Sequence, residues 1–228
     1  MKPPSAFRSA LLGVFCAAAL NAFAAAKPNI LFILVDDMGW VDCGAYGSKY
    51  YETPAIDRFA TRAMKFTDAY AACPVCSPTR ASIMTGKYPA RLHITDWIPG
   101  DSAKADGAHR FLHVQDRNEL PLEQLTVAEI LAGAGYQTFF AGKWHLGGDG
   151  YLPTNQGFEV NLGGGHYGQP PHGYFAPWQI PSLPEGVSGE YLTERLTKES
   201  VKFLQYRDRQ RPFLLFLSHY DVHTPIHK

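Results

Sequence analysis

A continuous apolar run that ends in two aspartates constrains the fold of this chain more than any other feature. Residues 29–35 read Asn-Ile-Leu-Phe-Ile-Leu-Val, and Asp36 and Asp37 follow directly. A run of this length without polar alternation is typical of a strand that is buried on both faces, as in parallel sheets. We therefore predict that the folded chain begins with a buried strand of a parallel sheet.

Strand and helix signals alternate along the rest of the chain. Further strands are predicted over residues 136–141 and 212–218, and helices over residues 53–64, 77–85, 126–134 and 188–207. Thr53 and Pro54 suit the N-cap and first position of one helix, and Gly135 ends another. This alternation predicts an α/β fold with a mainly parallel sheet.

A segment rich in Gly and Pro separates the last two predicted strands. Residues 147–190 carry many of the 21 Gly and 17 Pro of the chain, with aromatic residues between them. We expect a long, structured surface excursion here rather than a linker, because Tyr174, Phe175 and Trp178 need burial.

Length and composition fit one α/β domain. The chain has 228 residues, of which 46% are hydrophobic, and this suffices for a sizeable core. Basic and acidic residues balance at 21 each, so no nucleic-acid partner is expected.

The N-terminus has the pattern of a secretory signal peptide. Lys2 and Arg8 precede an apolar run over residues 10–20, and small residues follow it. We predict a signal peptide over residues 1–26 and a protein exported to the periplasm or the extracellular space. The run is too short for a stable membrane span, although an uncleaved anchor is the alternative.

The cysteine count is odd once the predicted leader is removed. Cys43, Cys73 and Cys76 remain, and an odd cysteine in an exported protein needs an explanation. One arrangement is a Cys43–Cys73 disulfide with a modified Cys76. Alternatively, Cys76 is a buried structural thiol or pairs with Cys73.

Polar residues follow three of the predicted strands, at the edge where ligands bind in parallel sheets. They are Asp36 and Asp37, then Lys143 and His145, then His219 and His223. Adjacent carboxylates at a strand end favour a hard divalent cation between them, Ca²⁺ before Mg²⁺. A turn or capping role for one aspartate is the alternative.

The segment that begins at Cys76 carries the most specific pattern. It reads Cys-Ser-Pro-Thr-Arg over residues 76–80, and a Thr-Gly-Lys-Tyr-Pro segment follows at residues 85–89. Residues 142–147, Gly-Lys-Trp-His-Leu-Gly, and the His-Thr-Pro segment at 223–225 add to it. Together these segments resemble the formylglycine-dependent sulfatase family of the alkaline-phosphatase superfamily, including arylsulfatases and N-acetylgalactosamine-6-sulfatases. Thr79 stands where Ser is commoner in that family.

The resemblance implies a covalent mechanism for sulfate-ester hydrolysis. A formylglycine-generating enzyme would convert Cys76 to formylglycine (3-oxoalanine), whose hydrate attacks sulfur beside the divalent cation. Asp36, Asp37 and residue 76 would ligate that cation, and Arg80 would hold the hydrate. Residue 76 is expected at a helix N-terminus, where backbone N–H groups face developing negative charge.

The resemblance also assigns roles around the sulfate group. Lys143 would neutralise sulfate oxygens, and His145 would hydrogen-bond the formylglycine hydroxyl. His223 would contact sulfate and give a proton to the leaving alcohol, with His219 and His227 as neighbouring competitors. His166 and His172 are weaker candidates for the substrate side, and surface positions are the alternative for both.

The resemblance covers the front half of a sulfatase, with residues 27–228 as the N-terminal portion of its catalytic domain. A second pair of metal ligands is expected beyond Lys228, so this polypeptide alone should bind metal weakly and turn over poorly. The expected substrate is a sulfated small molecule or carbohydrate. The alternatives are a phosphoesterase of the same superfamily and a truncated, non-catalytic module that binds sulfated glycans.

Overall fold

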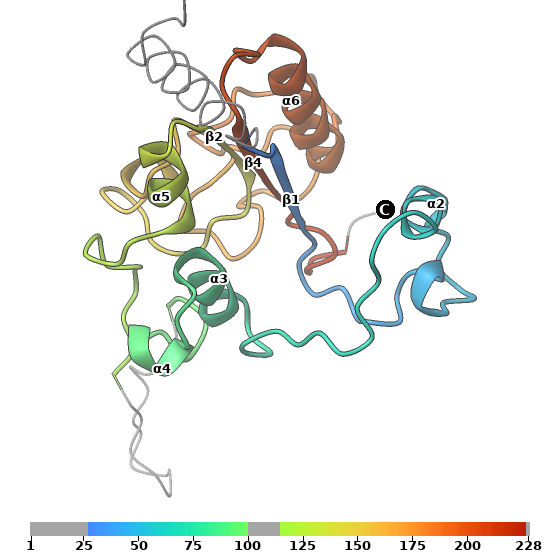
Figure 1. Cartoon of the computed structure of the whole chain (residues 1–228), viewed down its shortest axis with the longest axis horizontal. Coiled ribbons are helices and arrows are strands. Elements are labelled where there is room, and N and C mark those ends of the chain that lie inside the picture. Colours follow the sequence, from blue (N-terminus) through green and yellow to red (C-terminus); the bar gives the residue numbers. More distant parts are fainter. Residues whose placement is uncertain (1–26, 100–114, 227–228) are drawn as a thin grey trace, which may run out of the picture.

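Four parallel strands form the central sheet of the structure. The computed structural model describes residues 27–99 and 115–226, so the predicted signal peptide and His227 lie outside the described residues. The strands are β1 (Ile30–Leu34), β2 (Gln137–Gly142), β3 (Val160–Leu162) and β4 (Phe213–Ser218), in the order β1-β4-β2-β3. Every pairing is parallel, which confirms the predicted α/β class (Figure 1).

Helices cover both faces of this sheet. Figure 1 shows α6 (Leu192–Tyr206) on one side, with α3 (Cys76–Thr85) and α5 (Val127–Gly133) on the other. The short α4 (Pro89–Leu92) follows α3, and α2 (Pro54–Ala60) packs on the 3₁₀ turn η1 (Gly44–Tyr46) away from the sheet. A second 3₁₀ turn, η3 (Pro153–Asn155), precedes β3.

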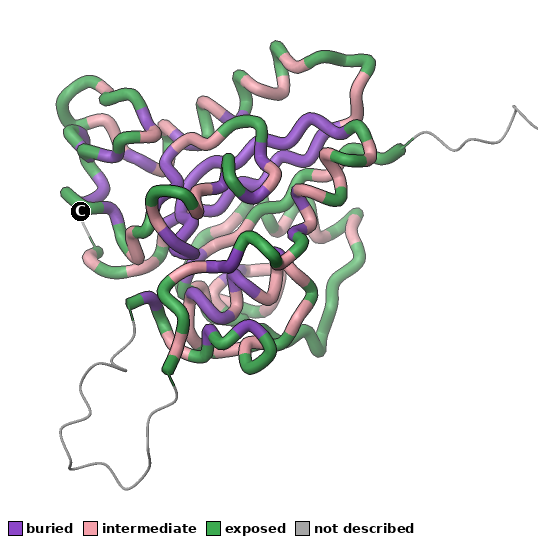
Figure 2. The backbone as a smooth tube through the Cα atoms, turned by 90° about the vertical axis from the view of Figure 1, so that its left-hand side faces the viewer, coloured by how far each residue is buried: buried purple, intermediate pink, exposed green. Residues whose placement is uncertain are grey.

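The core divides into two clusters because side chains alternate across the strands. Phe140, Leu214 and Phe216 face the α3 and α5 side, whereas Phe139 and Leu215 face α6. All residues of β2 and β4 are buried, and these strands belong to the buried backbone drawn in purple in Figure 2. The two inner strands therefore fix the positions of the loops that leave their carboxyl ends.

β1 is a strand as predicted, but the prediction that it is buried on both faces is wrong. Leu31 is 52% exposed and Ile33 is 56% exposed. β1 lies at the edge of the sheet with β4 as its one neighbour, and the described residues leave the face of Leu31 and Ile33 open. On the other face Phe32 stacks on Phe216 at 4.6 Å between ring centroids.

Local sequence signals account for some helix boundaries, but the predicted N-cap Thr53 makes no capping hydrogen bond through its side chain. Thr126 caps α5 through a capping box with Glu129, at the predicted start. α3 begins at Cys76, one residue before the predicted start, and ends before Gly86. α2 ends at Ala60 rather than at residue 64, and α6 begins at Leu192 rather than at residue 188.

The excursion over residues 147–190 is ordered by buried aromatic side chains, as expected. Tyr174 is 3% exposed and Trp178 is fully buried. The expected burial of Phe175 is wrong, because Phe175 is 38% exposed and contacts Tyr191 at the surface. Sequence reasoning also missed β3, which has only three residues.

The three cysteines in the described part of the chain are unpaired. Cys43, Cys73 and Cys76 are all free thiols, so the suggested Cys43–Cys73 disulfide is not formed. The two residues belong to separate segments with their own hydrogen bonds: the carbonyl of Cys43 accepts from the η1 turn, and Cys73 is bound by Thr79.

None of the helices within residues 27–99 and 115–226 is long and apolar enough to cross a membrane.

Candidate active site

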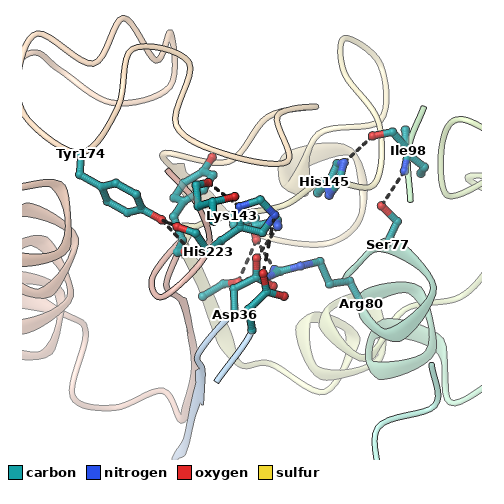
Figure 3. Close-up of polar contacts among 12 residues, drawn as sticks. Asp36, Ser77, Arg80, Ile98, Lys143, His145, Tyr174 and His223 are labelled. Carbon is teal, nitrogen blue, oxygen red and sulfur yellow. Dashed lines mark hydrogen bonds and ion pairs between the residues drawn. The ribbon is translucent and has the colours of Figure 1, made fainter. Parts of the chain in front are cut away.

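The carboxyl ends of three strands bring the predicted polar groups together. Asp36 and Asp37 follow β1, Lys143 and His145 follow β2, and His223 lies beyond the end of β4. Figure 3 shows Asp36, Lys143, Arg80 and His223 around one point, with His145 to one side. The rule for ligand sites in parallel sheets therefore selected groups that do lie close together.

Asp36 sits between two buried cations. Its Oδ1 accepts a hydrogen bond from Arg80 Nη2 at 2.8 Å, and its Oδ2 accepts from Lys143 Nζ. The side chains of Arg80 and Lys143 are 4% and 0% exposed, and that of Asp36 is 7% exposed. Burial alone would raise the pKa of Asp36, but the charges of Arg80 and Lys143 outweigh burial and lower it.

Arg80 also ties α3 to the ends of the two inner strands. Its Nη1 donates to the carbonyl of Lys143 at 2.7 Å and to Ser218 Oγ at 2.6 Å. Sequence reasoning placed Arg80 against residue 76, whereas the structure places its hydrogen bonds on Asp36, Lys143 and Ser218. Its Nε is buried and has no partner among the described residues.

Lys143 is buried as part of this network rather than exposed to solvent. Burial, followed by repulsion from Arg80, lowers its pKa, whereas the ion pair with Asp36 opposes that shift. Lys143 does not line the large cavity described below. Its ammonium group is instead paired with Asp36 beneath the surface.

His145 is buried and neutral. Burial, and then the charge of Lys143, lowers the pKa of His145 from 6.5 to about 4. Its Nε2 contacts the carbonyl oxygen of Ile98, and a carbonyl can only accept, so Nε2 carries the hydrogen. Nδ1 is then an acceptor, and it is buried without a partner in the described part of the chain.

The segment that carries His223 is bound to the segment that carries Asp36. The N–H of Asp36 donates to the carbonyl of Asp221 at 2.8 Å, and the N–H of Val222 donates to the carbonyl of Asp36 at 2.7 Å. From the other side, the hydroxyl of Tyr174 donates to the carbonyls of Tyr220 and His223 at 2.9 and 2.8 Å. These bonds hold His223 over the two aspartates.

Three side chains form a donor set for a divalent cation. Ligand atoms of Asp36, Asp37 and His223 all lie within 4.8 Å of one another. His223 Nε2 is 3.8 Å from Asp37 Oδ2, and the Asp37 side chain is 57% exposed. Carboxylate oxygens suit Ca²⁺ or Mg²⁺, so the chemistry of the set fits such an ion. Arg80 and Lys143 each bind one oxygen of Asp36.

A cavity of about 550 Å³ opens beside this donor set. Cys76 lines it as the first residue of α3, together with Asp37, His145 and His223. Trp97, His166 and Tyr167 line another part of its wall. His172 and His219 are not among the lining residues, and Nδ1 of His219 is buried without a partner in the described residues.

Several residues of this site were not predicted from the sequence. Ser218 ends a predicted strand, so a polar residue after an apolar run was the available signal. Ile98 takes part through its backbone N–H and carbonyl, which contact Ser77 and His145. Its residue type therefore gave no signal. Ser77 lies inside the cysteine motif, and Tyr174 was expected only as a core residue.

Comparisons with known proteins agree on one family. The sulfatase family profile matches residues 28–228. The chain is 40% identical to arylsulfatase A of Bos taurus over 157 residues, which are 68% of this chain and 28% of that protein. It is 32% identical to N-acetylgalactosamine-6-sulfatase of Canis lupus familiaris over 241 residues, which are 95% of this chain and 44% of that protein.

A solved structure gives the same result for the fold. The structure of Ps i-CgsB in complex with k-i-k-neocarrahexaose superimposes with a TM-score of 0.68 at 30% identity, over 88% of this chain and 46% of that chain. The chain thus spans less than half the length of each of these proteins. The family match covers nearly all of the residues after the predicted leader, and on this ground the chain belongs to the sulfatase family.

Proposed function

We propose that this chain is the N-terminal portion of an exported enzyme that hydrolyses O-sulfate monoesters through a formylglycine formed from Cys76. One observation carries the proposal: Cys76 begins α3 and lines the same cavity as Asp37, His145 and His223. In this proposal residues 1–26 are the signal peptide, residues 27–228 belong to the catalytic domain, and a formylglycine-generating enzyme is the maturation partner.

In this proposal, formylglycine would supply the nucleophile and a divalent cation would supply positive charge. Formylglycine at residue 76 would supply a hydrated aldehyde as the nucleophile, and Asp36 and Asp37 would hold a divalent cation that acts as a Lewis acid. Asp37 is exposed to the cavity, so its carboxylate is the accessible half of this pair. Asp36 is the buried half, fixed by Arg80 and Lys143.

Two histidines that line the cavity are suited to move protons during the reaction. His145 has a free acceptor at Nδ1, so it can take a proton from a hydroxyl on residue 76. His223 lies at the cavity wall near Asp37, where it can give a proton to the leaving alcohol oxygen. Different environments thus divide the acid and base roles between two residues of one type.

Fixed positive charge favours an anionic substrate in this cavity. The N-terminus of α3 presents backbone N–H groups at Cys76, and Arg80 and Lys143 lie behind it. These groups support stabilisation of the negative charge that builds on sulfate oxygens in the transition state.

We propose a sulfated carbohydrate as the substrate class. Trp97 is 42% exposed and lines the cavity with Tyr167 and His166, whose rings lie 4.2 Å apart. Aromatic faces at a polar cavity suit the apolar faces of sugar rings. The names of two similar proteins, an N-acetylgalactosamine-6-sulfatase and Ps i-CgsB bound to a neocarrahexaose, point the same way.

Mass spectrometry and kinetics together test the proposal. The complete protein should be produced with a formylglycine-generating enzyme, and the peptide that contains residue 76 should lose about 18 Da relative to the thiol form. Hydrolysis of an aryl sulfate should require this change and should fall to background in Cys76→Ala. An aryl phosphate offered in parallel should turn over far more slowly.

The opposite results would refute this function. Full sulfatase activity with an unmodified Cys76 would exclude the formylglycine mechanism, and faster cleavage of the phosphate ester would favour a phosphoesterase. Binding of sulfated sugars without turnover, by a fully converted protein, would favour a non-catalytic module.

A further inference from the structure

The backbone of Ile98 bridges two parts of the site. Its N–H donates to Ser77 Oγ, with 3.1 Å between the two atoms, and its carbonyl accepts from Nε2 of His145 (Figure 3). Ser77 comes from the first turn of α3, and His145 follows β2. The side chain of Ser77 is fully buried and His145 is 2% exposed, so solvent does not replace either hydrogen bond.

The bond to Ile98 decides which nitrogen of His145 carries the hydrogen. With Nε2 donating to a carbonyl, the neutral ring has its lone pair at Nδ1, which is the atom that faces no described partner. The ring also lies close to Gly168, where an added Cβ would be 2.9 Å from Cε1 of His145. Without the hydrogen bond to the Ile98 carbonyl, the neutral ring of His145 could adopt either tautomer.

From this geometry we infer that Ser77 is a positioning residue, which fixes the Nε2–H tautomer of His145 through the backbone of Ile98. Ser77 touches neither the reacting atoms nor His145 itself. It anchors the N–H of Ile98 to α3, and thereby sets where the Ile98 carbonyl points. Trp97, the next residue toward the N-terminus, lines the cavity wall.

This role gives a reason for a hydroxyl at the second position of the cysteine motif. Residues next to a modified cysteine are usually read as recognition sequence for the modifying enzyme. In this structure the side chain of Ser77 points into the protein and has a structural partner 21 residues away. The inference rests on the proposed function only for its effect on rate, because the tautomer of His145 is a property of the folded chain.

The test compares two serines on one helix. Ser82 also lies on α3 and its Oγ is buried, but it has no hydrogen-bond partner in the described residues. Ser77→Ala and Ser82→Ala should be made in the complete protein, produced with a formylglycine-generating enzyme. Peptide mass over residue 76 then gives the converted fraction, to which each kcat is normalised.

Two readouts must change together in Ser77→Ala. Nitrogen-15 NMR of labelled histidine should show His145 leaving the Nε2–H form, and kcat should fall about tenfold with KM within about twofold, as expected for a lost positioning bond. Ser82→Ala should keep the wild-type tautomer and kcat. Ser77→Thr, which keeps a hydroxyl, should restore both readouts.

The inference fails if Ser77→Ala keeps either the Nε2–H form of His145 or the kcat of Ser82→Ala. If Ser77→Ala does not fold, judged by circular dichroism, Ser77→Val replaces it, with Ser77→Thr as its control of equal size. A wild-type protein that is unconverted and inactive would contradict the proposed function instead, and the NMR comparison would still decide the role of Ser77.

Discussion

The guanidinium of Arg80 and the carboxylate of Asp36 form a buried ion pair, with 2.8 Å between Nη2 and Oδ1. The pair joins the helix that begins at Cys76 to the end of the edge strand β1. It is the direct link between the predicted nucleophile segment and the predicted metal ligands. Its burial makes each partner depend on the other, because a lone charge at this depth has no solvent to stabilise it.

Removal of Arg80 should therefore destabilise the protein strongly. Arg80→Gln leaves Asp36 buried with Lys143 as its one remaining cation, and we expect a loss of about 3–5 kcal/mol in the free energy of unfolding. Urea denaturation measures this loss. The matched control is Lys198→Gln, which removes a cation that is 60% exposed, and it should cost less than about 1 kcal/mol. Equal losses in the two variants would mean that the buried ion pair contributes no more to the free energy of unfolding than an exposed one.

Stability should fall as the pH decreases from 6.5 to about 4, the two ends of the pKa shift of His145. In this interval the unfolded chain binds a proton at His145 that the folded protein does not bind, so the free energy of unfolding decreases with each step toward acid. The decrease for one such histidine is on the order of 3 kcal/mol. Urea denaturation across this range measures it.

His145→Gln should flatten that dependence in part. His219 keeps a contribution in the same direction, because burial also lowers its pKa. Protonation of Asp36 affects the free energy of unfolding only at lower pH, because the pKa of Asp36 lies below 3.8. Exposed His172 provides the control for loss of a histidine side chain, and His172→Gln should leave the free energy of unfolding at pH 7 unchanged. An unaltered slope in His145→Gln would contradict the assignment of a neutral, buried ring.

The meeting of the site residues could be predicted from the sequence, whereas the exposure of β1 could not, and both outcomes have physical causes. Asp36, Lys143 and His223 were predicted to meet because the carboxyl ends of parallel strands share one edge, and that rule needs only strand order and polarity. The exposure of β1 was not predictable in the same way. An apolar run shows that a strand forms, whereas its position at the edge depends on which strands pair with it.

Backbone groups escaped prediction for a different reason. The carbonyl of Ile98 orients His145, but every residue carries a carbonyl, so the sequence around position 98 gives no signal for this role. The short β3 also lacks a pattern, because three residues are too few to show alternation.

Calcium should bind weakly to the polypeptide of residues 27–228. The described residues offer two carboxylates and one imidazole, and Arg80 and Lys143 already occupy both oxygens of Asp36. Ca²⁺ takes six to eight oxygen ligands, so we expect a Kd of about 1 mM or weaker and little turnover. Isothermal titration calorimetry measures the affinity, and Asp37→Asn should weaken it further. Submicromolar binding or full activity would show that these residues suffice.

Gly142 should not tolerate a side chain. An added Cβ would lie 1.8 Å from the carbonyl oxygen of Ser218, where β2 and β4 end side by side. Gly142→Ala should cost more than about 3 kcal/mol of unfolding free energy, because backbone must move to make room. Gly150→Ala isolates the effect of positive φ, since φ is 85° and no atom lies within 4 Å, and it should cost about 1 kcal/mol. Thermal and urea unfolding of both variants compare the two costs.

The pairing of β1 with β4 also shapes how a newly made chain reaches its folded state. Phe213 N–H donates to Asn29 Oδ1 across 184 residues of sequence, so the first strand finds its neighbour only after almost everything between them exists. Until then β1 is an apolar, unpaired segment that can aggregate with other chains. Chaperones that bind it should raise the yield of folded protein. The aspartates at its end reach their final geometry together with residues 221 and 222, so we expect the proposed cation site to form late in folding.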